Sequence, residues 1–458
     1  MSLDQSPDTP SVHGIWATRW VFILAAAGSA VGLGNIWKFP YITGEYGGGA
    51  FVLVYLLCVL FIGVPVMVAE VLIGRRARAA PVNAVQKLAK ESGASRRWGL
   101  LGWMGTITGF LILSFYSMIA GWTLYYIVLL AKGTFTAADS TAVNAEFGSL
   151  LADPYTMLAV HSLFMAVTIW IVASGVQRGL ERAVRLMMPV LVALLFVLLG
   201  YAMSTGHFMD GVRFLFHWDF SKLTSQAILA AMGHAFFTLS LGMGAIMAYG
   251  AYMPRGQLIG PSVMAVAAFD TAFALLVGLA IFPIVFAHGL QPAAGPGLMF
   301  VTLPLAFGNL PMGDAFGTVF FVLVALAAWT SAISIAEPFV AWAVEKGMNR
   351  LTAASIIGIT SWFLGIFSIL SFNLMKGAEY HVFGRSFFDA LDFLTTNILL
   401  PLGGVLIAVF VGWVMKETKV MKELQMRNQA IYIAWRIAVR IVAPLAILAV
   451  MLNFLGVF

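Results

Sequence analysis

Long apolar runs separated by short polar segments occupy almost the whole chain. Eleven of them approach or exceed the roughly 20 residues that an α-helix needs to cross a bilayer. They lie near 16–42, 48–75, 100–131, 157–176, 183–204, 224–253, 258–287, 314–345, 351–371, 384–415 and 429–456. The pattern predicts an all-α polytopic membrane protein with eleven transmembrane helices.

The first run is interrupted in its middle, where the segment from Gly28 to Asn35 contains three glycines and an asparagine. A helix that opens inside a bilayer needs an ion, a ligand or protein partners for its freed peptide groups. Glycine lets the backbone open, and the side-chain carbonyl of Asn35 can bind a cation. Glycines also serve as close contacts between helices. This run alone therefore leaves both interpretations open.

A second interruption lies in the sixth run, where hydroxyls and glycines are mixed into the segment from Phe236 to Gly244. Broken helices at matching positions of two five-helix halves are typical of inverted-repeat transporters, which bind substrate between the breaks. The matched breaks favour a binding site over simple packing. We expect a tail at 1–15, a first half at 16–204, a second half at 224–415 and an eleventh span at 429–456.

Composition supports a membrane protein. Apolar residues make up 61% of the chain and charged residues 10%, and the mean hydropathy is +0.94, which no soluble domain of this length would show. The net charge of +6 does not indicate nucleic-acid binding, because the basic residues lie in short loops. Arg75, Arg76 and most other basic residues lie in loops on the same side of the membrane as the N-terminus. This distribution predicts a cytoplasmic N-terminus and an extracytoplasmic C-terminus in the cell's inner (plasma) membrane.

Few residues indicate chemistry outside the breaks. The single cysteine, Cys58, excludes disulfides and thiolate metal sites. Asp270 and Glu70 are acids inside apolar runs, and such residues are functional by default. There is no cluster of metal ligands at the usual spacing, no nucleophile elbow and no phosphate loop, which disfavours an enzyme. A channel, or a sensor that binds a ligand without moving it, is not excluded by the pattern.

Several segments together carry a resemblance to a known family. From Trp16 to the end, the chain resembles the neurotransmitter:sodium symporter family, and within it the bacterial amino-acid transporters. The resemblance implies a leucine-transporter-like fold and sodium-coupled transport by alternating access. The segments that carry it are Trp16–Arg19, Gly28–Pro40, Gly47–Gly49, Phe236–Gly244, Ala327–Ser331 and Asp392.

The resemblance implies two bound sodium ions, and sodium suits the neutral oxygens that a broken helix offers. The first site falls on Ala30, Asn35, Thr238 and Asp270, and the second falls on Gly28, Val31, Ala327, Thr330 and Ser331. The two hydroxyls of the second site could instead bond to the preceding helical turn. The Asp270 carboxylate lies near the place where chloride-dependent relatives hold an anion, so we expect no chloride requirement. It could also take up a proton after sodium leaves.

Substrate class follows from Gly32, which stands where amine-transporting relatives carry an aspartate. Without that charge, an amino acid that brings its own carboxylate is favoured over a monoamine. The walls are apolar, and a flexible methionine at 243 suits several side-chain shapes, so we expect neutral hydrophobic or aromatic amino acids; another small zwitterion is the alternative. The implied substrate positions are Ala30, Gly32, Leu33, Gly34, Ile112, Tyr116, Phe237, Thr238, Ser240, Met243, Ser331 and Ile335.

Two gates are implied by the same resemblance. The outer gate pairs Lys38 with Asp392 above a lid of Tyr116 and Phe237. The inner gate involves Trp16 and Glu345, with His13 where relatives carry an arginine. For His234, which precedes the second break, we expect a hydrogen bond between helices. The expected partners are the substrate and the lipid bilayer, and the expected assembly is a monomer or weak dimer.

Overall fold

The structure is a computed structural model that describes residues 14–254, 256–290, 297–426 and 428–455. Within these ranges the regular structure is helical, and β-pairing is limited to an isolated bridge between Val382 and Arg385. His13 and the rest of the predicted tail up to that residue lie outside the described residues.

Nine helical segments are long and apolar enough to cross a membrane, and one bent pair makes a tenth, among the described residues. Several are continuous helices that include short π-helical turns. The nine are α3–η2–α4 (Gly49–Ala77), η3–α6 (Arg96–Ala131), α8 (Pro154–Ala173), η4–α9 (Val176–Ser204), α13 (Ile259–Phe286), α15 (Gly313–Glu345), α16 (Arg350–Leu370), α17–η8–α18–η9 (Phe387–Val414) and α20–η10–α21 (Gln429–Asn453).

The first and sixth predicted spans are the two that are broken. The first consists of α1 (Arg19–Ala30) and a second helix made of η1 (Gly34–Lys38) and α2 (Phe39–Glu45), bent by 52° at the break. The sixth is divided between α11 (Ser225–Thr238) and α12 (Ala245–Ala251), with six non-helical residues between them. Neither half of the sixth span is long enough to cross a membrane alone. The described part of the chain therefore contains nine helical segments of sufficient length, or ten when the bent pair is counted as one span.

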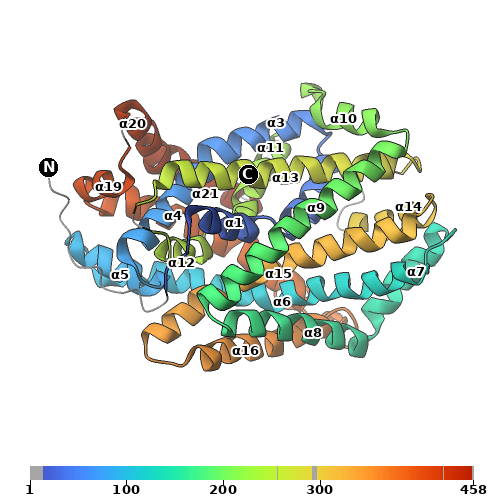
Figure 1. Cartoon of the computed structure of the whole chain (residues 1–458), viewed down its shortest axis with the longest axis horizontal. Helices are drawn as coiled ribbons and strands as arrows, with labels where there is room; N and C mark the ends of the chain where they lie inside the picture. Colours follow the sequence, from blue (N-terminus) through green and yellow to red (C-terminus); the bar gives the residue numbers. More distant parts are fainter. Residues whose placement is uncertain (1–13, 255, 291–296, 427, 456–458) are drawn as a thin grey trace.

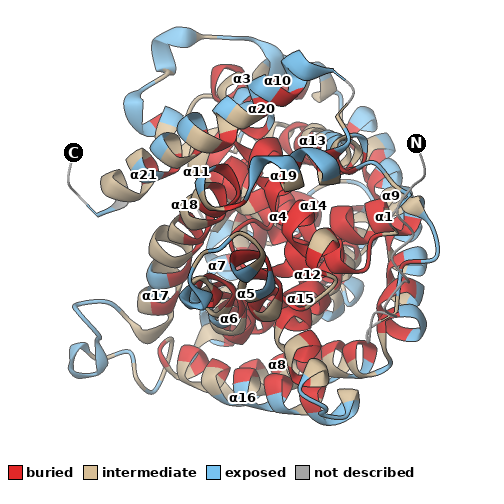
Figure 2. Ribbon diagram, turned by 90° about the vertical axis from the view of Figure 1, so that its left-hand side faces the viewer, coloured by how far each residue is buried: buried red, intermediate tan, exposed pale blue. Residues whose placement is uncertain are grey.

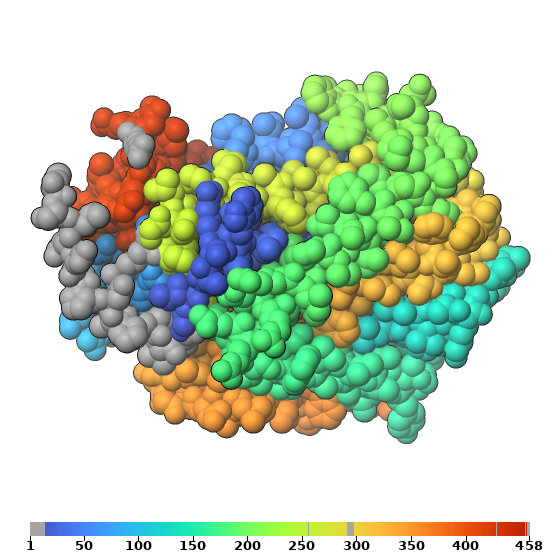
Figure 3. Space-filling view, viewed as in Figure 1, coloured from blue at the N-terminus to red at the C-terminus, as the bar shows by residue number. Residues whose placement is uncertain are grey.

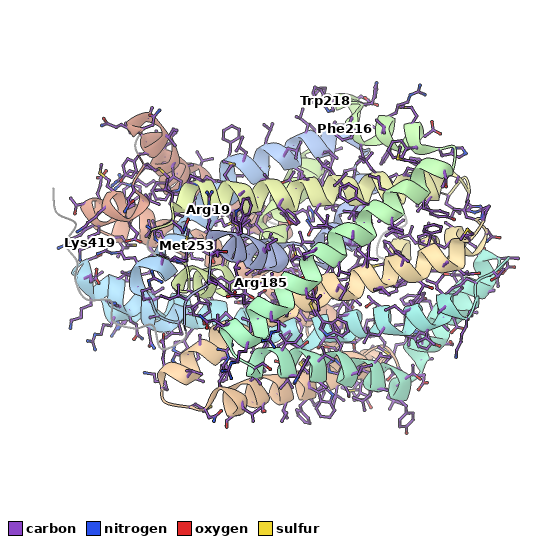
Figure 4. All side chains as sticks on the ribbon, in the orientation of Figure 1. Arg19, Arg185, Phe216, Trp218, Met253 and Lys419 are labelled. Atoms are coloured by element: carbon purple, nitrogen blue, oxygen red, sulfur yellow. The ribbon has the colours of Figure 1, made fainter. Side chains whose placement is uncertain are left out.

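Shorter helices lie at the two ends of the bundle (Figure 1). Helices α5 (Pro81–Glu91) and α19 (Glu417–Leu424) lie at one end, called the α5 end below. Helices α7 (Ser140–Ala152), α10 (Phe208–Phe216) and α14 (Leu303–Gly308) lie at the opposite, α7 end. Figure 4 shows Lys419 at the α5 end, and Phe216 and Trp218 near α10.

The buried core runs through the middle of the bundle. Figure 2 shows that α4 (Val64–Ala77), α12 and α15 are mostly buried, whereas α16 at the periphery alternates between buried and exposed residues. Small residues let the central helices approach closely, which is the usual way to pack helices that gain little from the hydrophobic effect in lipid. A Cβ on Gly105 or Gly109 of α6 would lie 3.1–3.2 Å from backbone atoms of α15 or the second break. This core places both breaks against α6 and α15.

Candidate ion and substrate site

The first break begins where α1 ends at Ala30. Val31 is extended (ψ 105°), although its N–H still donates to the Ala27 carbonyl at 2.7 Å. The freed carbonyls accept hydrogen bonds from side chains. The Ser29 carbonyl accepts from Ser240 Oγ at 2.8 Å and from Ser331 Oγ at 3.2 Å. Hydroxyls from the second break and from α15 therefore replace the missing helical donors.

The second break turns the chain through three residues with positive φ. Ser240, Gly242 and Gly244 have φ values of +54°, +84° and +78°, a region that glycine enters without steric cost. The freed N–H of Gly242 donates to Glu70 Oε1 of α4 at 2.7 Å. This hydrogen bond joins α4 to the second break, and it satisfies a buried amide that α12 cannot pair.

The two breaks meet, as the inverted-repeat interpretation predicted. A Cβ on Gly34 would lie 3.4 Å from the Phe237 ring, and the bond between Ser240 and Ser29 joins the same two segments. Both contacts depend on a glycine or a small hydroxyl residue. The close approach explains why small residues interrupt both apolar runs.

Three residues of the implied first sodium site form one buried cluster. Asn35 Nδ2 donates to Asp270 Oδ1 at 2.8 Å, and Thr238 Oγ1 donates to Asp270 Oδ2 at 3.2 Å. Asn35 Oδ1 accepts from the Gly32 N–H at 3.2 Å. The Asp270 side chain is fully buried, and no described Lys, Arg or His forms an ion pair with it. A buried carboxylate without a countercharge is costly, so the cluster suits a bound cation. Ala30, the fourth implied ligand, is the last residue of α1.

The implied second sodium site lies between α1 and α15. A Cβ on Gly28 would lie 3.3 Å from Thr330 Cβ, so these helices are in contact at the expected place. Ser331 Oγ donates to the carbonyls of Ser29 and Val31, at 3.2 and 3.4 Å. Thr330 Oγ1 donates to the Ala327 carbonyl at 2.9 Å, which is the alternative bond to the preceding turn. All five implied ligands are therefore brought to one contact between two helices.

The surroundings of Gly32 leave no room for a side chain. A Cβ on Gly32 would lie less than 3.0 Å from Ser331 Oγ and 3.3 Å from the Tyr116 hydroxyl oxygen. That hydroxyl is buried and makes no hydrogen bond with a described residue. A buried donor without a partner indicates that a ligand or water supplies one. Tyr116 and Gly32 thus define a place where a polar ligand group can lie.

The other implied wall residues are apolar and lie close to that place. Ile112, Met243 and Ile335 are buried. A Cβ on Gly109 would lie 3.1 Å from the Ile335 carbonyl oxygen and 3.7 Å from that of Met243, so α6, α15 and the second break share this wall. Leu33 directly precedes η1, and no side chain caps that helix start. The wall formed by these implied residues carries no charged side chain.

The implied outer gate lines a cavity of about 240 Å³ beside the two breaks. Lys38, Phe237 and Asp392 all lie on its wall. Lys38 Nζ lies 4.6 Å from the centre of the Phe237 ring, a cation–π distance. No ion pair within 4.0 Å joins the described residues Lys38 and Asp392. The gate residues are therefore neighbours, but the predicted pair is not formed in this structure.

His234 also lines this cavity, and the hydrogen bond expected for it is wrong. Its ring stacks on Phe39 at 5.9 Å and lies 5.2 Å from the Tyr55 ring. Neither ring nitrogen has a hydrogen-bond partner among the described residues. Aromatic packing, rather than a polar bond, holds this side chain between the helices.

Trp16 and Glu345 of the implied inner gate contact different partners at the α5 end. The backbone N–H of Trp16 donates to the Tyr252 carbonyl at 2.9 Å, and its indole N–H donates to the Tyr249 carbonyl at 3.2 Å. Glu345 accepts from the Ala80 N–H at 2.6 Å and from Asn83 Nδ2 at 2.5 Å. Trp16 thus fastens the chain to the end of α12, and Glu345 fastens α15 to α5. The third gate residue, His13, lies outside the described residues.

A buried ion pair near this end was missed by the sequence analysis. Glu337 of α15 is fully buried, pairs with Arg350 at 2.5 Å and accepts from the Tyr252 hydroxyl at 2.6 Å. The signal was available, because Glu337 is an acid in an apolar run, like Asp270. Ser29 and Ser334, whose hydroxyl oxygens are 2.7 Å apart, were also missed. Serines in helices give no comparable signal.

Two broken helices that meet around buried oxygens define a secondary transporter. Residues 13–142 and 152–458 match the model of the Sodium:neurotransmitter symporter family, and the chain belongs to this family. It is 40% identical over 450 residues to the sodium-dependent transporter YhdH of Bacillus subtilis (strain 168), covering 96% of this chain and 98% of that one. It is 34% identical to a sodium-dependent transporter of Haemophilus influenzae, with 96% and 97% covered.

A solved structure has the same fold. The crystal structure of MhsT in complex with L-phenylalanine aligns with a TM-score of 0.87 and 43% identity, covering 96% of this chain and 99% of that one. These findings confirm the expected family and its leucine-transporter-like fold. The chain is a sodium-dependent membrane transporter and not an enzyme.

Proposed function

We propose that this sodium-dependent symporter takes up neutral, mainly hydrophobic or aromatic, L-amino acids by alternating access. The observation that carries the proposal is the close approach of Ser331 and Tyr116 to Gly32, which leaves no room for a side chain at this position. A substrate that binds there meets no fixed carboxylate from the first break. A zwitterion supplies its own, which can ligate sodium and couple the ion to the substrate.

The polar and apolar groups near Gly32 support an amino acid in particular. The Tyr116 hydroxyl, which has no partner among the described residues, and the backbone amides of Leu33 and Gly34 can donate to a substrate carboxylate. The buried wall of Ile112, Met243 and Ile335 suits an apolar side chain. The L-phenylalanine in the MhsT complex, at 43% identity, supports the same class of substrate for this chain.

Two sodium ions and no chloride are part of the proposal. Each implied site gathers oxygens from a break and from a neighbouring helix, α13 or α15. The Asp270 carboxylate already supplies a negative charge beside the first site, so an additional anion is not needed for charge balance. We expect uptake to persist when gluconate replaces chloride; uptake that collapses under this replacement would contradict chloride independence.

The proposed orientation places the α5 end in the cytoplasm. Arg75, Arg76, Lys87 and Lys419 belong to the α4, α5 and α19 segments at this end, in agreement with the positive-inside rule. The C-terminus after the eleventh span then faces outward. A monomer or weak dimer suffices, because the residues of the proposed site all come from one chain.

A thermal-shift screen of the standard amino acids tests the substrate class. The purified protein is heated with each amino acid in sodium chloride and, as the control, in choline chloride of equal concentration. A ligand that binds the folded state raises the melting temperature according to its concentration relative to its Kd. We expect a shift with leucine, phenylalanine or related amino acids in sodium only. Absence of any sodium-dependent shift would refute the proposal.

A further inference from the structure

An apolar groove of about 670 Å³ lies at the α5 end, outside the ion and substrate site. Three walls form it: the α3–η2–α4 segment, the start of α13, and the segment from α19 to η10 (Ala438–Val442). In Figure 3 the red residues of α19 and α20 lie beside the yellow-green start of α13. Its lining residues include Phe61, Val64, Leu258, Met264, Ile431 and Trp435.

The groove is open to the surroundings of the bundle and not to its core. Phe61, Leu258, Met264 and Ile431 have exposed fractions of 56%, 44%, 45% and 58%. These residues lie at the ends or outer faces of membrane-spanning segments, where the solvent is lipid. A groove lined by such residues must be filled by something apolar.

The length of the groove matches one leaflet of a bilayer. Its α3–η2–α4 wall runs from Leu60 to Val68, which at 1.5 Å per residue is about 12 Å. The hydrocarbon core of a bilayer is about 30 Å thick, so one leaflet is about 15 Å deep. The groove also ends at a polar boundary, because Gln425 and Asn428 line it where α19 leads into α20.

Positive charge lies near that polar boundary. Lys422 of α19 and Lys416, which directly precedes this helix, are exposed. Neither forms an ion pair with a described residue. Basic residues beside a membrane surface attract lipid phosphates. The polar end of the groove thus offers groups for a phosphate, and the apolar part offers room for a hydrocarbon chain.

We propose that the groove binds one acyl chain of a membrane phospholipid, with the phosphate beside α19. A second copy of the chain would have to insert an equally narrow apolar element into a groove only one leaflet deep. A lipid chain fits this length without any change in the protein. The proposal does not depend on which substrate the transporter carries.

The bound chain would support the helices that hold the two breaks. Val64, Pro65 and Val68 of the groove belong to α4, which carries Glu70. Leu258, Pro261 and Met264 precede Asp270 on or next to α13. Trp435 Nε1 donates to the Pro65 carbonyl at 3.1 Å and fixes an indole on the groove wall. That indole is a spectroscopic probe of the occupant.

The test measures quenching of Trp435 fluorescence in bilayers of phosphatidylglycerol whose acyl chain is brominated near its middle. The Trp435 contribution is the difference between each protein and its Trp435→Phe version. Gly260→Phe plugs the groove, because a Cβ on Gly260 would approach only the end of Met426, at 3.9 Å. Gly200→Phe is the matched control on α9, where a Cβ would meet nothing within 4 Å.

We expect bromine to quench Trp435 in the unmodified protein and in Gly200→Phe, and this quenching to be lost in Gly260→Phe. Monodisperse elution and an unchanged helical circular-dichroism spectrum establish that each variant is folded. Ala438→Leu, which fills the groove from another wall, must give the same loss. Equal quenching in all variants, or none in the unmodified protein, would overturn the proposal.

Discussion

Serine hydroxyls replace missing backbone donors at the first break. The Ser29 carbonyl accepts from both Ser240 and Ser331, so one oxygen joins the first break to the second break and to α15. A buried carbonyl that loses such a donor costs about 1–3 kcal/mol. Substitutions that displace either hydroxyl are therefore expected to act on the whole site.

Gly32→Ala is expected to weaken sodium binding by roughly 5- to 150-fold, which corresponds to the loss of about 1–3 kcal/mol. The added Cβ would lie less than 3.0 Å from Ser331 Oγ and would push this hydroxyl away from the Ser29 and Val31 carbonyls. The sodium concentration that gives half of the thermal shift measures the effect.

A double-mutant cycle is the control for this mechanism. In a Ser331→Ala background the displaced hydroxyl is already absent, so Gly32→Ala is expected to add much less. Gly148→Ala, at an exposed site of α7 with no neighbour within 4 Å of its Cβ, should have no effect on sodium binding. Full additivity of Gly32→Ala and Ser331→Ala would contradict the mechanism.

Substitutions of Asp270 and Glu70 are expected to affect sodium and substrate binding differently, although both residues are buried acids. Asp270 contacts Asn35 and Thr238, whereas Glu70 accepts the Gly242 amide. Asp270→Ala should weaken sodium and substrate binding together, whereas Glu70→Gln should retain part of both, because an amide oxygen can still accept from Gly242. Calorimetric titration of substrate at several sodium concentrations measures this, and equal losses in both variants would refute the division of roles.

Among the helices, α5 and α19 are joined by charged side chains at the α5 end. Glu91 accepts from Arg76 at 3.0 Å and from Lys419 at 3.1 Å, and Arg75 of α4 pairs with Glu423 at 2.6 Å. Partial burial raises the pKa of Glu91, but the hydrogen bonds and charges of Lys419 and Arg76 outweigh it and hold the pKa below its ordinary value. The folded state therefore favours the ionised carboxylate.

The contribution of Glu91 to stability is expected to depend on pH with a definite sign. Because its pKa is lower in the folded state, the stabilisation is present above the ordinary value of 4.5 and is lost as the pH falls through the folded pKa. The difference in melting temperature between the unmodified protein and Glu91→Gln should be positive at neutral pH, shrink as the pH falls below 4.5 and vanish below the folded pKa. Glu379→Gln, at an exposed position without an ion pair to a described residue, is the control; a Glu91→Gln difference that grows on acidification would contradict the assignment.

The apolar pattern predicted the helices and their two breaks, because glycines and hydroxyls that cluster inside apolar runs occur where a helix opens or packs closely. It also singled out Asp270, an isolated charge in such a run. Side-chain contacts between segments that lie far apart in the sequence were harder to predict. The Lys38–Asp392 pair depends on how far two flexible side chains extend in one conformation. Nothing in the sequence around Arg350 reveals that its side chain reaches the buried Glu337.

At the scale of the whole molecule, the orientation can be tested with the single cysteine removed. Cys58 is only 7% exposed, so Cys58→Ala gives a background without thiols. Lys346→Cys lies at the exposed end of α15 on the α5 side, and Ser140→Cys lies at the exposed start of α7. An impermeant maleimide should label Ser140→Cys in intact cells, and Lys346→Cys only after permeabilisation. The reverse pattern would contradict the proposed orientation.

The contact of Trp16 with the end of α12 has a consequence for sequence divergence. Both hydrogen bonds of Trp16 end on backbone carbonyls, those of Tyr249 and Tyr252, and every residue type carries such a carbonyl. A substitution at 249 or 252 therefore keeps both acceptors, although it removes a tyrosine ring that packs edge-to-face on the Trp16 indole. Loss of the indole at position 16 removes a donor outright. Selection on the two hydrogen bonds therefore acts mainly on position 16, whereas positions 249 and 252 are constrained by the ring packing and not by the bonds themselves.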